Sequence, residues 1–390
     1  ELFLNKFLWS DNNSTLEIII NKRLNNFLDT SVVLPDLKNK KNICKKAVFK
    51  DPKINDFFEV KIDYLNSKFN YKNFIKTNKD LYKKYFNLEK NKLFIKKNNI
   101  NIGENLFIPG GMKVMLKPNQ KIILSNNAFI FSKSPWIFNG KKGKIFFGGI
   151  KKNMGGGLLI TDTNQKSEFN NVIFSNLTGY PIEKNFEHII LGSVNFNQTS
   201  LELRNVEFNN IFSEDAINIF RSDFKIINSN YVNIESDAID IDFSNGQIKK
   251  AKFTNIKNDA IDFSGSEVVV IDTSFTNVDD KLISAGEGSD IKVEKISAKN
   301  SYAGIVSKDG SVVYSNNIIF DGVKIPFAAY QKKNEYEYPE INLESYNVNN
   351  YVVKAVKDKT SKMENVDNTK IMKSKDILAL MYKKKLSLIN

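Results

Sequence analysis

A six-residue segment recurs at a fixed interval of 22 residues in the second half of this chain. The first three copies read Asp-Ala-Ile followed by Asn or Asp, and the six copies begin at Asp215, Asp237, Asp259, Lys281, Ala303 and Ile325. A period between 20 and 50 residues is typical of repeat proteins whose repeats stack on one another. Equivalent residues of such a stack form columns, so the repeat predicts which side chains are neighbours in space.

Each repeat contains short apolar segments and leaves no room for a helix. A second segment recurs 22 residues apart as Phe253-Thr-Asn-Ile256 and Phe275-Thr-Asn-Val278, and a third short strand follows most of the first segments. Three short strands per 22 residues predict an all-β fold, a right-handed parallel β-helix. Asn233, Asn255 and Asn277 are then expected to form a ladder of amides, and the Phe and Tyr residues of the second segment to stack in the core.

The repeat divides the chain into three regions. Residues 1–95 show no repeat and are predicted to form an irregular N-terminal cap or a small mixed domain. Residues 96–340 are predicted to form the β-helix, and residues 341–390 a C-terminal cap. A short amphipathic helix at residues 374–382 is expected to cover the last open coil, because the end of a solenoid exposes strand edges and core.

The charge balance limits the partners. The formal net charge is +13, and it comes from lysine, since arginine occurs only at positions 23, 204 and 221. This balance favours contact with a polyanion. Arginine is the preferred residue for phosphate and guanine contacts, so no nucleic-acid partner is expected. A solvated lysine surface is the other explanation of the same charge.

Cysteine, histidine and hydropathy exclude further classes. The chain has one cysteine, Cys44, and one histidine, His188. An internal disulfide framework and a Cys-rich metal site are therefore excluded, and a His-based metal site or a Ser-His-Asp triad is disfavoured. No apolar run approaches the ~20 residues of a membrane span, so no transmembrane segment is expected. The first residue is Glu1 rather than Met, which suggests a processed or trimmed chain.

The repeat also carries a resemblance. Asp215-Ala-Ile-Asn-Ile-Phe-Arg-Ser222, Asp237-Ala-Ile-Asp-Ile-Asp-Phe-Ser-Asn-Gly246 and Asp259-Ala-Ile-Asp-Phe-Ser-Gly-Ser266 resemble the repeats of bacterial right-handed parallel β-helix proteins. Members of that group are typically exported, and many act on polysaccharides. The resemblance implies an extracellular or cell-surface location, with the periplasm as an alternative. The Gly-His-Gly and Arg-Ile-Lys signatures of polygalacturonases are absent.

Strand alternation predicts which repeat residues face outward. One outward column is Asn218, Asp240, Asp262, Ser284, Val306 and Ala328, and the other is Phe220, Asp242, Ser264, Gly286, Lys308 and Tyr330. Stacked coils lie about 4.8 Å apart, so Asp240 and Asp262 are expected to be direct neighbours. Two carboxylates at that distance repel by about 3.5 kcal/mol at an effective dielectric constant of about 20. A bound cation, a paired lysine or a retained proton can relieve this repulsion.

Three interpretations of these residues remain open. In the first, Asp240, Asp242 and Asp262 are catalytic carboxylates acting on a sugar chain. In the second, Asp240 and Asp262 bind Ca²⁺, and Lys308 or Lys281 is the base. In the third, the acids are solvated surface positions balanced by lysine and by Arg221. No cofactor is required by the sequence, and Ca²⁺ is the one candidate ion.

Further residues are candidates for substrate binding. They are polar or aromatic residues in or beside the outward columns, namely Arg221, Lys281, Glu287, Asp309, Tyr330 and Lys332. Asp215, Asp237 and Asp259 are instead expected to be structural, because an aspartate at a turn accepts backbone N–H bonds.

The sequence therefore predicts an exported or surface protein that binds an acidic polysaccharide and cleaves or modifies it, as a lyase, glycoside hydrolase or epimerase. The alternative is a non-catalytic structural or adhesive β-helix that is one part of a larger surface assembly.

Overall fold

The computed structural model describes residues 80–180, 190–333 and 336–388, together with the backbone of four short strands nearer the N-terminus. The chain divides into two units, residues 1–71 and 72–390. The described strands of the first unit are β1 (Lys6–Ser10), β2 (Thr15–Ile19), β3 (Lys46–Lys50) and β4 (Phe57–Lys61). They form a sheet in which β1 with β2, and β3 with β4, are antiparallel, whereas β2 and β3 are parallel.

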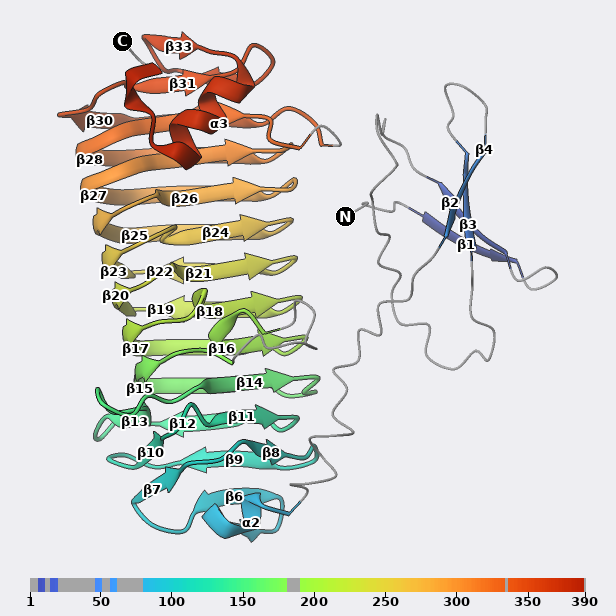
Figure 1. Ribbon diagram of the computed structural model, residues 1–390, viewed down its shortest axis with the longest axis vertical. Helices are drawn as coiled ribbons and strands as arrows, with labels where there is room; N and C mark the ends of the chain where they lie inside the picture. Colours follow the sequence, from blue (N-terminus) through green and yellow to red (C-terminus); the bar gives the residue numbers. More distant parts are fainter. Residues whose placement is uncertain are drawn as a thin grey trace. The chain divides into compact units, whose positions relative to one another are not determined.

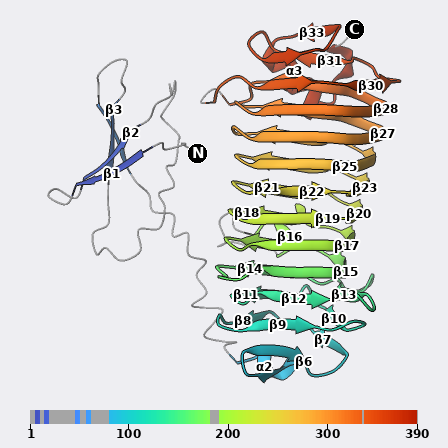
Figure 2. The same cartoon turned by 180° about the vertical axis from the view of Figure 1, so that it is seen from behind.

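The second unit is a parallel β-solenoid, which confirms the predicted fold class (Figure 1). Its strands stack into three parallel sheets, here called sheets I, II and III. The aspartate repeat forms the middle of sheet I (Figures 1 and 2). Strands that belong to sheet I alone are β8 (Leu106–Ile108), β11 (Phe129–Ser132), β14 (Gly157–Thr161), β16 (Gly192–Asn197), β18 (Asp215–Phe220), β21 (Asp237–Asp242), β24 (Ile261–Ser264), β26 (Lys281–Gly286), β31 (Ala355–Lys357) and β33 (Thr369–Ile371).

The other two sheets complete each coil. Sheet II contains β6 (Lys92–Ile95), β9 (Lys113–Leu116), β12 (Trp136–Asn139), β19 (Asp223–Ile227), β22 (Asn245–Lys249), β29 (Glu340–Leu343) and β32 (Lys362–Glu364). Sheet III contains β7 (Asn99–Ile102), β10 (Lys121–Leu124), β13 (Ile145–Gly148), β20 (Asn230–Ile234), β23 (Lys252–Ile256) and β30 (Tyr346–Asn349).

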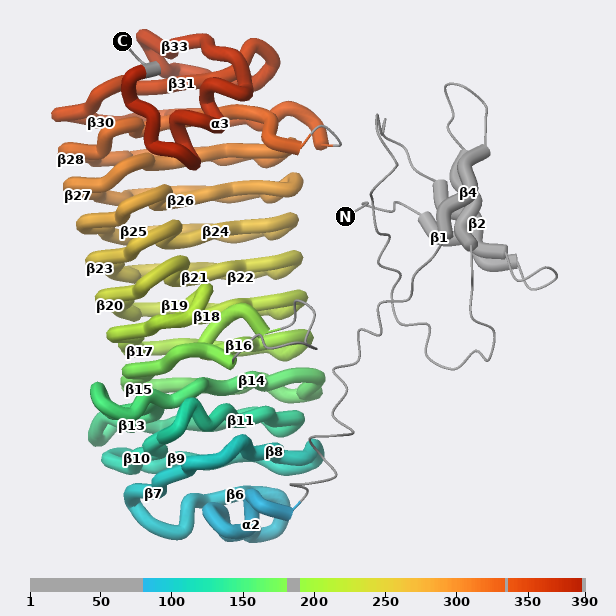
Figure 3. Tube along the Cα trace, in the orientation of Figure 1, coloured from blue at the N-terminus to red at the C-terminus, as the bar shows by residue number. Residues whose placement is uncertain are grey.

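Five long strands run around corners and so belong to more than one sheet. β15 (Ser167–Leu177), β17 (Leu201–Ile211) and β25 (Glu267–Val278) pass from sheet II into sheet III. β27 (Asp290–Lys308) and β28 (Val312–Tyr330) pass through all three sheets and supply the last copies of the aspartate repeat. The tube drawn along the chain shows these coils following one another from end to end (Figure 3).

The core consists of the columns that the repeat predicts. Ile217, Ile239, Ile261 and Ile283 occupy successive coils and are fully buried. In sheet III the predicted aromatic column is a stack of Phe174, Phe208, Tyr231, Phe253 and Phe275, with centroids 4.8–5.2 Å apart. The core is therefore continuous along the solenoid.

The predicted asparagine ladder is also present. The side-chain amide of Asn255 donates to Oδ1 of Asn233 at 2.9 Å, and that of Asn277 donates to Oδ1 of Asn255 at 2.9 Å. The three residues have φ of 55–57°, in the left-handed region that asparagine adopts more readily than most residues. Each asparagine thus turns the chain and bonds to the next coil.

Helices lie at the two ends of the second unit. The short helix α2 (Tyr82–Tyr85) precedes β5 (Phe86–Glu89), which pairs antiparallel with β6, and Tyr82 and Tyr85 are buried in the core. The helix α3 (Ser374–Lys383) and a turn of 3₁₀ helix, η1 (Leu386–Leu388), follow β33. Within the described residues, no helix is long and apolar enough to cross a membrane.

Candidate functional site

The outward face of sheet I carries the polar residues of the aspartate repeat. The register places Asp240 directly between Asn218 and Asp262, and Ser284 beyond Asp262, as the sequence predicts. Asp215, Asp237 and Asp259 belong to the same face, because the alternation of inward and outward residues is broken by the Ala-Ile pair that follows each aspartate. Ala238 and Ile239 are consecutive and both lie in the core, so the residue before them returns to the outer side.

The outward column is polar in the middle of the solenoid. Its members in successive coils are Phe107, Phe131, Leu159, Asn195, Asn218, Asp240, Asp262, Ser284, Val306, Ala328, Val356 and Lys370. Apolar residues thus stand on both sides of the polar middle, and outward-facing apolar residues need a cover.

One apolar end is covered by the connection between β15 and β16. The ring of Tyr180 lies 5.3 Å from the ring centroids of both Phe129 and Phe131, in edge-on contacts. Both phenylalanines are fully buried although they lie outside the main core cluster. Tyr180 thus covers these two outward phenylalanines of sheet I.

The other apolar end is covered by α3. Ile377, Leu380 and Met381 of the helix are fully buried in a separate cluster that includes Val306 and Ala328. The hydroxyl of Tyr302 donates to the carbonyl of Leu380 at 2.6 Å. The predicted C-terminal helix is confirmed, but the expectation that it covers the last open coil is wrong: it packs on the side of the solenoid, against sheet I (Figures 1 and 2). The physical reason is the apolar outward column, because Val306, Ala328 and Val356 are buried against the apolar side of the helix.

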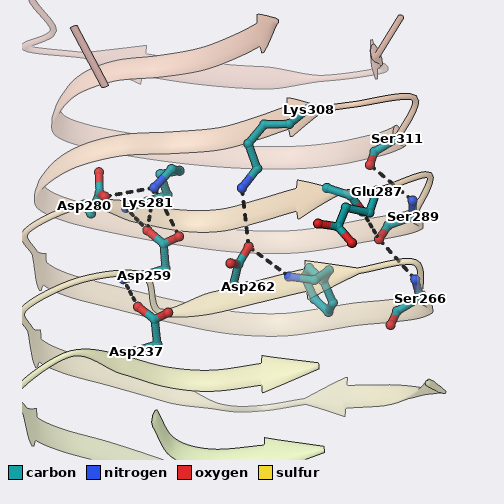
Figure 4. Close-up of polar contacts among 12 residues, drawn as sticks. Asp237, Asp259, Asp262, Ser266, Asp280, Lys281, Glu287, Ser289, Lys308 and Ser311 are labelled. Atoms are coloured by element: carbon teal, nitrogen blue, oxygen red, sulfur yellow. Dashed lines mark hydrogen bonds and ion pairs between the residues drawn. The ribbon is translucent and has the colours of Figure 1, made fainter. Parts of the chain in front are cut away.

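These two covers leave a polar window between them, here called the acidic face. It comprises Asp215, Asp237, Asp240, Asp242, Asp259 and Asp262, with Asn218, Ser284, Lys281 and Lys308. Figure 4 shows part of it, with Asp237, Asp259 and Asp262 on one side of the sheet and the two lysines above them.

Lys281 neutralises one edge of the acidic face. Its Nζ lies 2.9 and 3.1 Å from the two carboxylate oxygens of Asp259 and 2.8 Å from Asp280. Burial lowers the pKa of Lys281, but the two carboxylates outweigh burial and raise it. The ring of Tyr382 from α3 lies 5.1 Å from the same Nζ. Lys281 is therefore a buried structural cation rather than a contact for substrate.

Lys308 neutralises the neighbouring position. Its Nζ lies 3.6 Å from Asp262, and the side chain is almost fully buried. Burial opposes the charge of Lys308, but Asp262 outweighs burial and raises the pKa of the lysine. The ammonium keeps its proton at neutral pH, which favours a fixed cation over the base considered from the sequence.

The rest of the acidic face has carboxylates without such cations. Burial raises the pKa of Asp237 to about 8, and the carboxylates of Asp259 and Asp262 act in the same direction. Burial also raises the pKa of Asp240 and of Asp215, with the neighbouring acids adding to the effect. In the described residues, no lysine or arginine nitrogen lies within 4 Å of these three carboxylates.

Asn218 holds two of the acids together. Its amide nitrogen donates to Oδ2 of Asp240 at 2.8 Å and to Oδ2 of Asp242 at 3.3 Å. One amide group thus fixes two carboxylates that follow each other on the outer side of β21. Asp240 and Asp242 are two of the three carboxylates that the sequence predicts as catalytic, and the amide of Asn218 is their common donor.

Two buried polar atoms on this face have no hydrogen-bond partner within the part of the chain that the structure describes. They are Oδ2 of Asp215 and Oγ of Ser284. Buried side-chain polar atoms are nearly always hydrogen-bonded, and an exception suggests a missing ion or water. Asp237, Asp259 and Asp262 also place one carboxylate oxygen each within 4.8 Å of the other two. The sequence predicts Asp240 and Asp262 as the Ca²⁺ ligands. The set found in the structure contains Asp262, but it has Asp237 and Asp259 in place of Asp240.

The predicted substrate-binding residues separate into three groups. Lys281 and Tyr330 are buried, and the hydroxyl of Tyr330 reaches Tyr382 at 3.4 Å beneath α3. Asp309 is also buried and accepts the backbone N–H groups of Lys332 and Lys333 at 2.6 and 2.7 Å.

Glu287 forms an ion pair with Lys333. Lys332 is exposed, and its Nζ lies 4.9 Å from the Tyr382 ring centroid. Arg221 is exposed, with its guanidinium 4.9 Å from the Phe220 ring centroid. Arg221 and Lys332 are thus the exposed cations of the predicted set.

Sequence reasoning missed that Asp215, Asp237 and Asp259 share a face with the other acids. Their structural role is nevertheless visible, since Asp237 accepts the N–H of Asp259 at 2.7 Å and Asp259 that of Lys281 at 3.0 Å. The signal that could have placed them was the apolar pair Ala-Ile after each aspartate. Sequence reasoning also missed Tyr382, whose position beside Lys281 depends on how α3 packs against sheet I.

Comparisons with known proteins give similarity in structure and none in sequence. No protein-family model matches the chain, and no curated protein matches it. Among solved structures, the periplasmic alginate epimerase AlgG is 10% identical over 76% of this chain and 80% of that chain, with a TM-score of 0.46. The catalytic domain of a GH87 alpha-1,3-glucanase in complex with nigerose is 10% identical over 73% and 64%, with a TM-score of 0.43. An alginate lyase from Paenibacillus sp. str. FPU-7 is 14% identical over 66% and 92%, with a TM-score of 0.30. None of these similarities is close enough to assign a function to the chain.

Proposed function

We propose that this protein is exported or displayed on a cell surface, binds an acidic polysaccharide across the acidic face, and cleaves or modifies it. The observation that carries this proposal is the pair of carboxylates, Asp240 and Asp242, that Asn218 holds on the outer side of β21. The pair lies between the two covers of sheet I, where Tyr180 closes one end and α3 closes the other.

Paired carboxylates support proton transfer on a sugar. Hydrolysis of a glycosidic bond needs one carboxylic acid and one carboxylate, and elimination or epimerisation needs a group that removes a proton. Asp240 and Asp242 are the proposed proton-transfer groups. Asp262 and Lys308 flank them, and Lys308 supplies a fixed positive charge. The three reaction classes share this step, so the proposal covers all of them.

The proposal that the substrate is an acidic polysaccharide rests on the positive charge of the protein. The net charge of +13 attracts a polyanion to the molecule as a whole. Arg221 and Lys332 are exposed cations beside the acidic face, where they can contact the carboxylates of such a polymer. The acids of the face itself oppose an anionic ligand, and this repulsion needs a counter-ion.

One observation favours the non-catalytic alternative. Lys281, Asp309 and Tyr330 each make contacts inside the protein rather than toward solvent. A face whose charged groups serve internal contacts fits a structural or adhesive β-helix of a surface assembly.

The test is an activity assay on a panel of acidic and neutral polysaccharides, with product analysis for new chain ends, unsaturated ends and epimerised sugars. The wild type is compared with Asp240→Asn/Asp242→Asn. Asp272→Asn is the matched control, because Asp272 is exposed in β25, away from sheet I, and has a φ of 53° that asparagine also adopts.

Activity on an acidic polymer that is lost in the double variant and kept in the control supports the proposal. Activity that survives the double change removes Asp240 and Asp242 from the site. Binding to a polysaccharide without any product, across the whole panel, favours the adhesive alternative.

A further inference from the structure

The acidic face has more carboxylates than nearby cations. Lys281 is shared between Asp259 and Asp280, and Lys308 lies near Asp262 at 3.6 Å. Asp215, Asp237 and Asp240 have no lysine or arginine within ion-pair distance in the part of the chain that the structure describes. The excess negative charge is concentrated where β18, β21 and β24 adjoin.

Three of these carboxylates fit one ion. Asp237, Asp259 and Asp262 each offer an oxygen, and the three oxygens lie within 4.8 Å of one another. Oxygens bound to a single Ca²⁺ at 2.3–2.6 Å can be about 5 Å apart at most, so one ion can contact all three. Within the described residues, Asp237 and Asp262 accept one hydrogen bond each, whereas Asp259 accepts three from Lys281. An ionised carboxylate has about four acceptor sites, so each of the three keeps capacity for an ion.

A second observation points to an absent partner at the same place. Asp215 is 2% exposed, and its Oδ2 has no hydrogen-bond partner among residues 80–180, 190–333 and 336–388. Its carboxylate lies next to Asp237 in the same outward column and is close enough to Asp237 and Asp262 to interact with both. A bound cation would explain a buried carboxylate oxygen that stands in register with this cluster and has no partner among the described residues.

We propose that Asp237, Asp259 and Asp262 bind a divalent cation of the Ca²⁺ type, with Asp215 and Asp240 supplying further negative charge around it. The face offers oxygen donors only, and the whole chain has one histidine and one cysteine, so metals that prefer nitrogen or sulfur lack ligands. Ca²⁺ accepts six to eight oxygens in flexible geometry, whereas Mg²⁺ requires near-octahedral geometry. Water completes the coordination on the solvent side.

Lys281 and Lys308 contact two of the proposed ligands and leave room for the ion. Asp259 presents both oxygens to Lys281, at 2.9 and 3.1 Å, on the side away from Asp237 (Figure 4). Lys308 lies 3.6 Å from Asp262, longer than a direct ionic hydrogen bond, so the ion competes with a weak contact. A bound ion would also relieve the repulsion between the acidic face and an acidic polymer, and this role rests on the proposed function. The binding of the ion does not depend on that function.

The test is calorimetric titration of CaCl₂ into the full chain, first stripped with a chelator and free of polysaccharide, with MgCl₂ as a second probe. Thermal unfolding is followed with EDTA and with Ca²⁺. We expect one binding site, a Tm that rises with Ca²⁺ concentration and a weaker response to Mg²⁺. Asp237→Asn and Asp262→Asn should each weaken Ca²⁺ binding by at least about tenfold. Asp272→Asn, the control for charge, should leave it unchanged.

Asp237→Asn gives a second readout that a purely structural role would not produce. In EDTA the Asn variant should be at least as stable as the wild type, because the change removes a repelled carboxylate while Oδ1 still accepts the N–H of Asp259. In Ca²⁺ the order should reverse. Circular dichroism confirms that each variant is folded.

The inference is overturned if Ca²⁺ up to about 10 mM, above the range of weak extracellular Ca²⁺ sites, produces neither heat of binding nor a shift in Tm. It is also overturned if Asp237→Asn and Asp262→Asn both keep the Ca²⁺ affinity of the wild type. The third contradicting result is a loss of Ca²⁺ affinity in Asp272→Asn equal to that in the site variants. The proposed function is tested separately, through product formation by Asp240→Asn/Asp242→Asn. A protein that binds Ca²⁺ but modifies no polymer contradicts that proposal alone.

Discussion

Lys281 and Asp259 occupy the same outward column in adjacent coils, and the ammonium of Lys281 contacts both carboxylate oxygens of Asp259. Both side chains are about 95% buried or more. This pair stands where the acidic face ends and the apolar column under α3 begins. It is thus the junction between the candidate site and its cover.

Lys281→Met should destabilise the protein by about 3–5 kcal/mol, because it leaves Asp259 and Asp280 buried without their cation. The measurement is denaturant unfolding at neutral pH. Lys257→Met is the control, since Lys257 pairs with Asp279 at 3.1 Å with both side chains more than half exposed, and it should cost less than about 1 kcal/mol. Equal losses in the two variants would mean that burial of the Lys281 pair does not matter.

The cover formed by α3 can be tested at Leu380. This residue is fully buried against the cluster that includes Val306 and Ala328. Leu380→Ala should cost about 2–5 kcal/mol of the free energy that holds the helix in place. Helices at the edge of a fold can open locally, so we expect faster hydrogen exchange in residues 374–383 and 303–308, with the central coils unchanged. Lys375→Ala, on the exposed side of the helix, should change neither segment.

The asparagine ladder allows two effects to be separated at Asn255. Its amide group bonds to the coils on both sides, and its φ is 57°. Asn255→Gly removes the hydrogen bonds but keeps the left-handed backbone, whereas Asn255→Ala loses both. We expect the Ala variant to be less stable than the Gly variant by about 1 kcal/mol in denaturant unfolding. The loss of stability common to both variants measures the amide bonds, and a Gly variant that is no more stable than the Ala variant would contradict the backbone role.

Much of this fold follows from the sequence, because in a stack of coils two residues that are one repeat period apart pair with each other in adjacent coils. Asp240, Asp262 and Ser284 are neighbours since they are 22 residues apart, and the asparagine ladder follows in the same way. Simple alternation fails at the start of the aspartate repeat. The Ala-Ile pair after Asp237 sends two consecutive residues inward, so Asp237 joins the acidic face instead of serving only its turn.

The position of α3 was not predictable from its own pattern of apolar residues. Those residues specify one buried side of a helix but not the surface that it meets. That surface was present in the sequence as the outward residues Val306 and Ala328, which have no reason to be apolar unless something covers them. An outward apolar column is therefore a signal for a docking element elsewhere in the chain. The charges within the face were harder to assign, because they depend on Tyr382, Lys384 and other residues far away in sequence.

The packing of α3 against the solenoid should be sensitive to acid, because Asp358 binds the start of the helix through Ser374. Asp358 follows β31 and accepts the backbone N–H of Gln331 at 2.8 Å, the hydroxyl of Ser361 at 2.6 Å and that of Ser374, at the start of α3, at 3.2 Å. Burial alone would raise the pKa of Asp358, but the hydrogen bonds from Ser361, Gln331 and Thr360 outweigh burial and lower the pKa.

A carboxyl whose pKa is lower in the folded state contributes stability above its unfolded value of about 3.9, and this contribution is lost as the pH falls through the folded value. We therefore expect the stability difference between the wild type and Asp358→Asn to be largest near neutral pH and to shrink below about pH 4. Thermal unfolding of both proteins across this range measures the difference. Asp376→Asn, a partly exposed acid in the first turn of α3, serves as the control. A difference that stays constant down to pH 3 would show that the ionised form of Asp358 does not hold the helix in place.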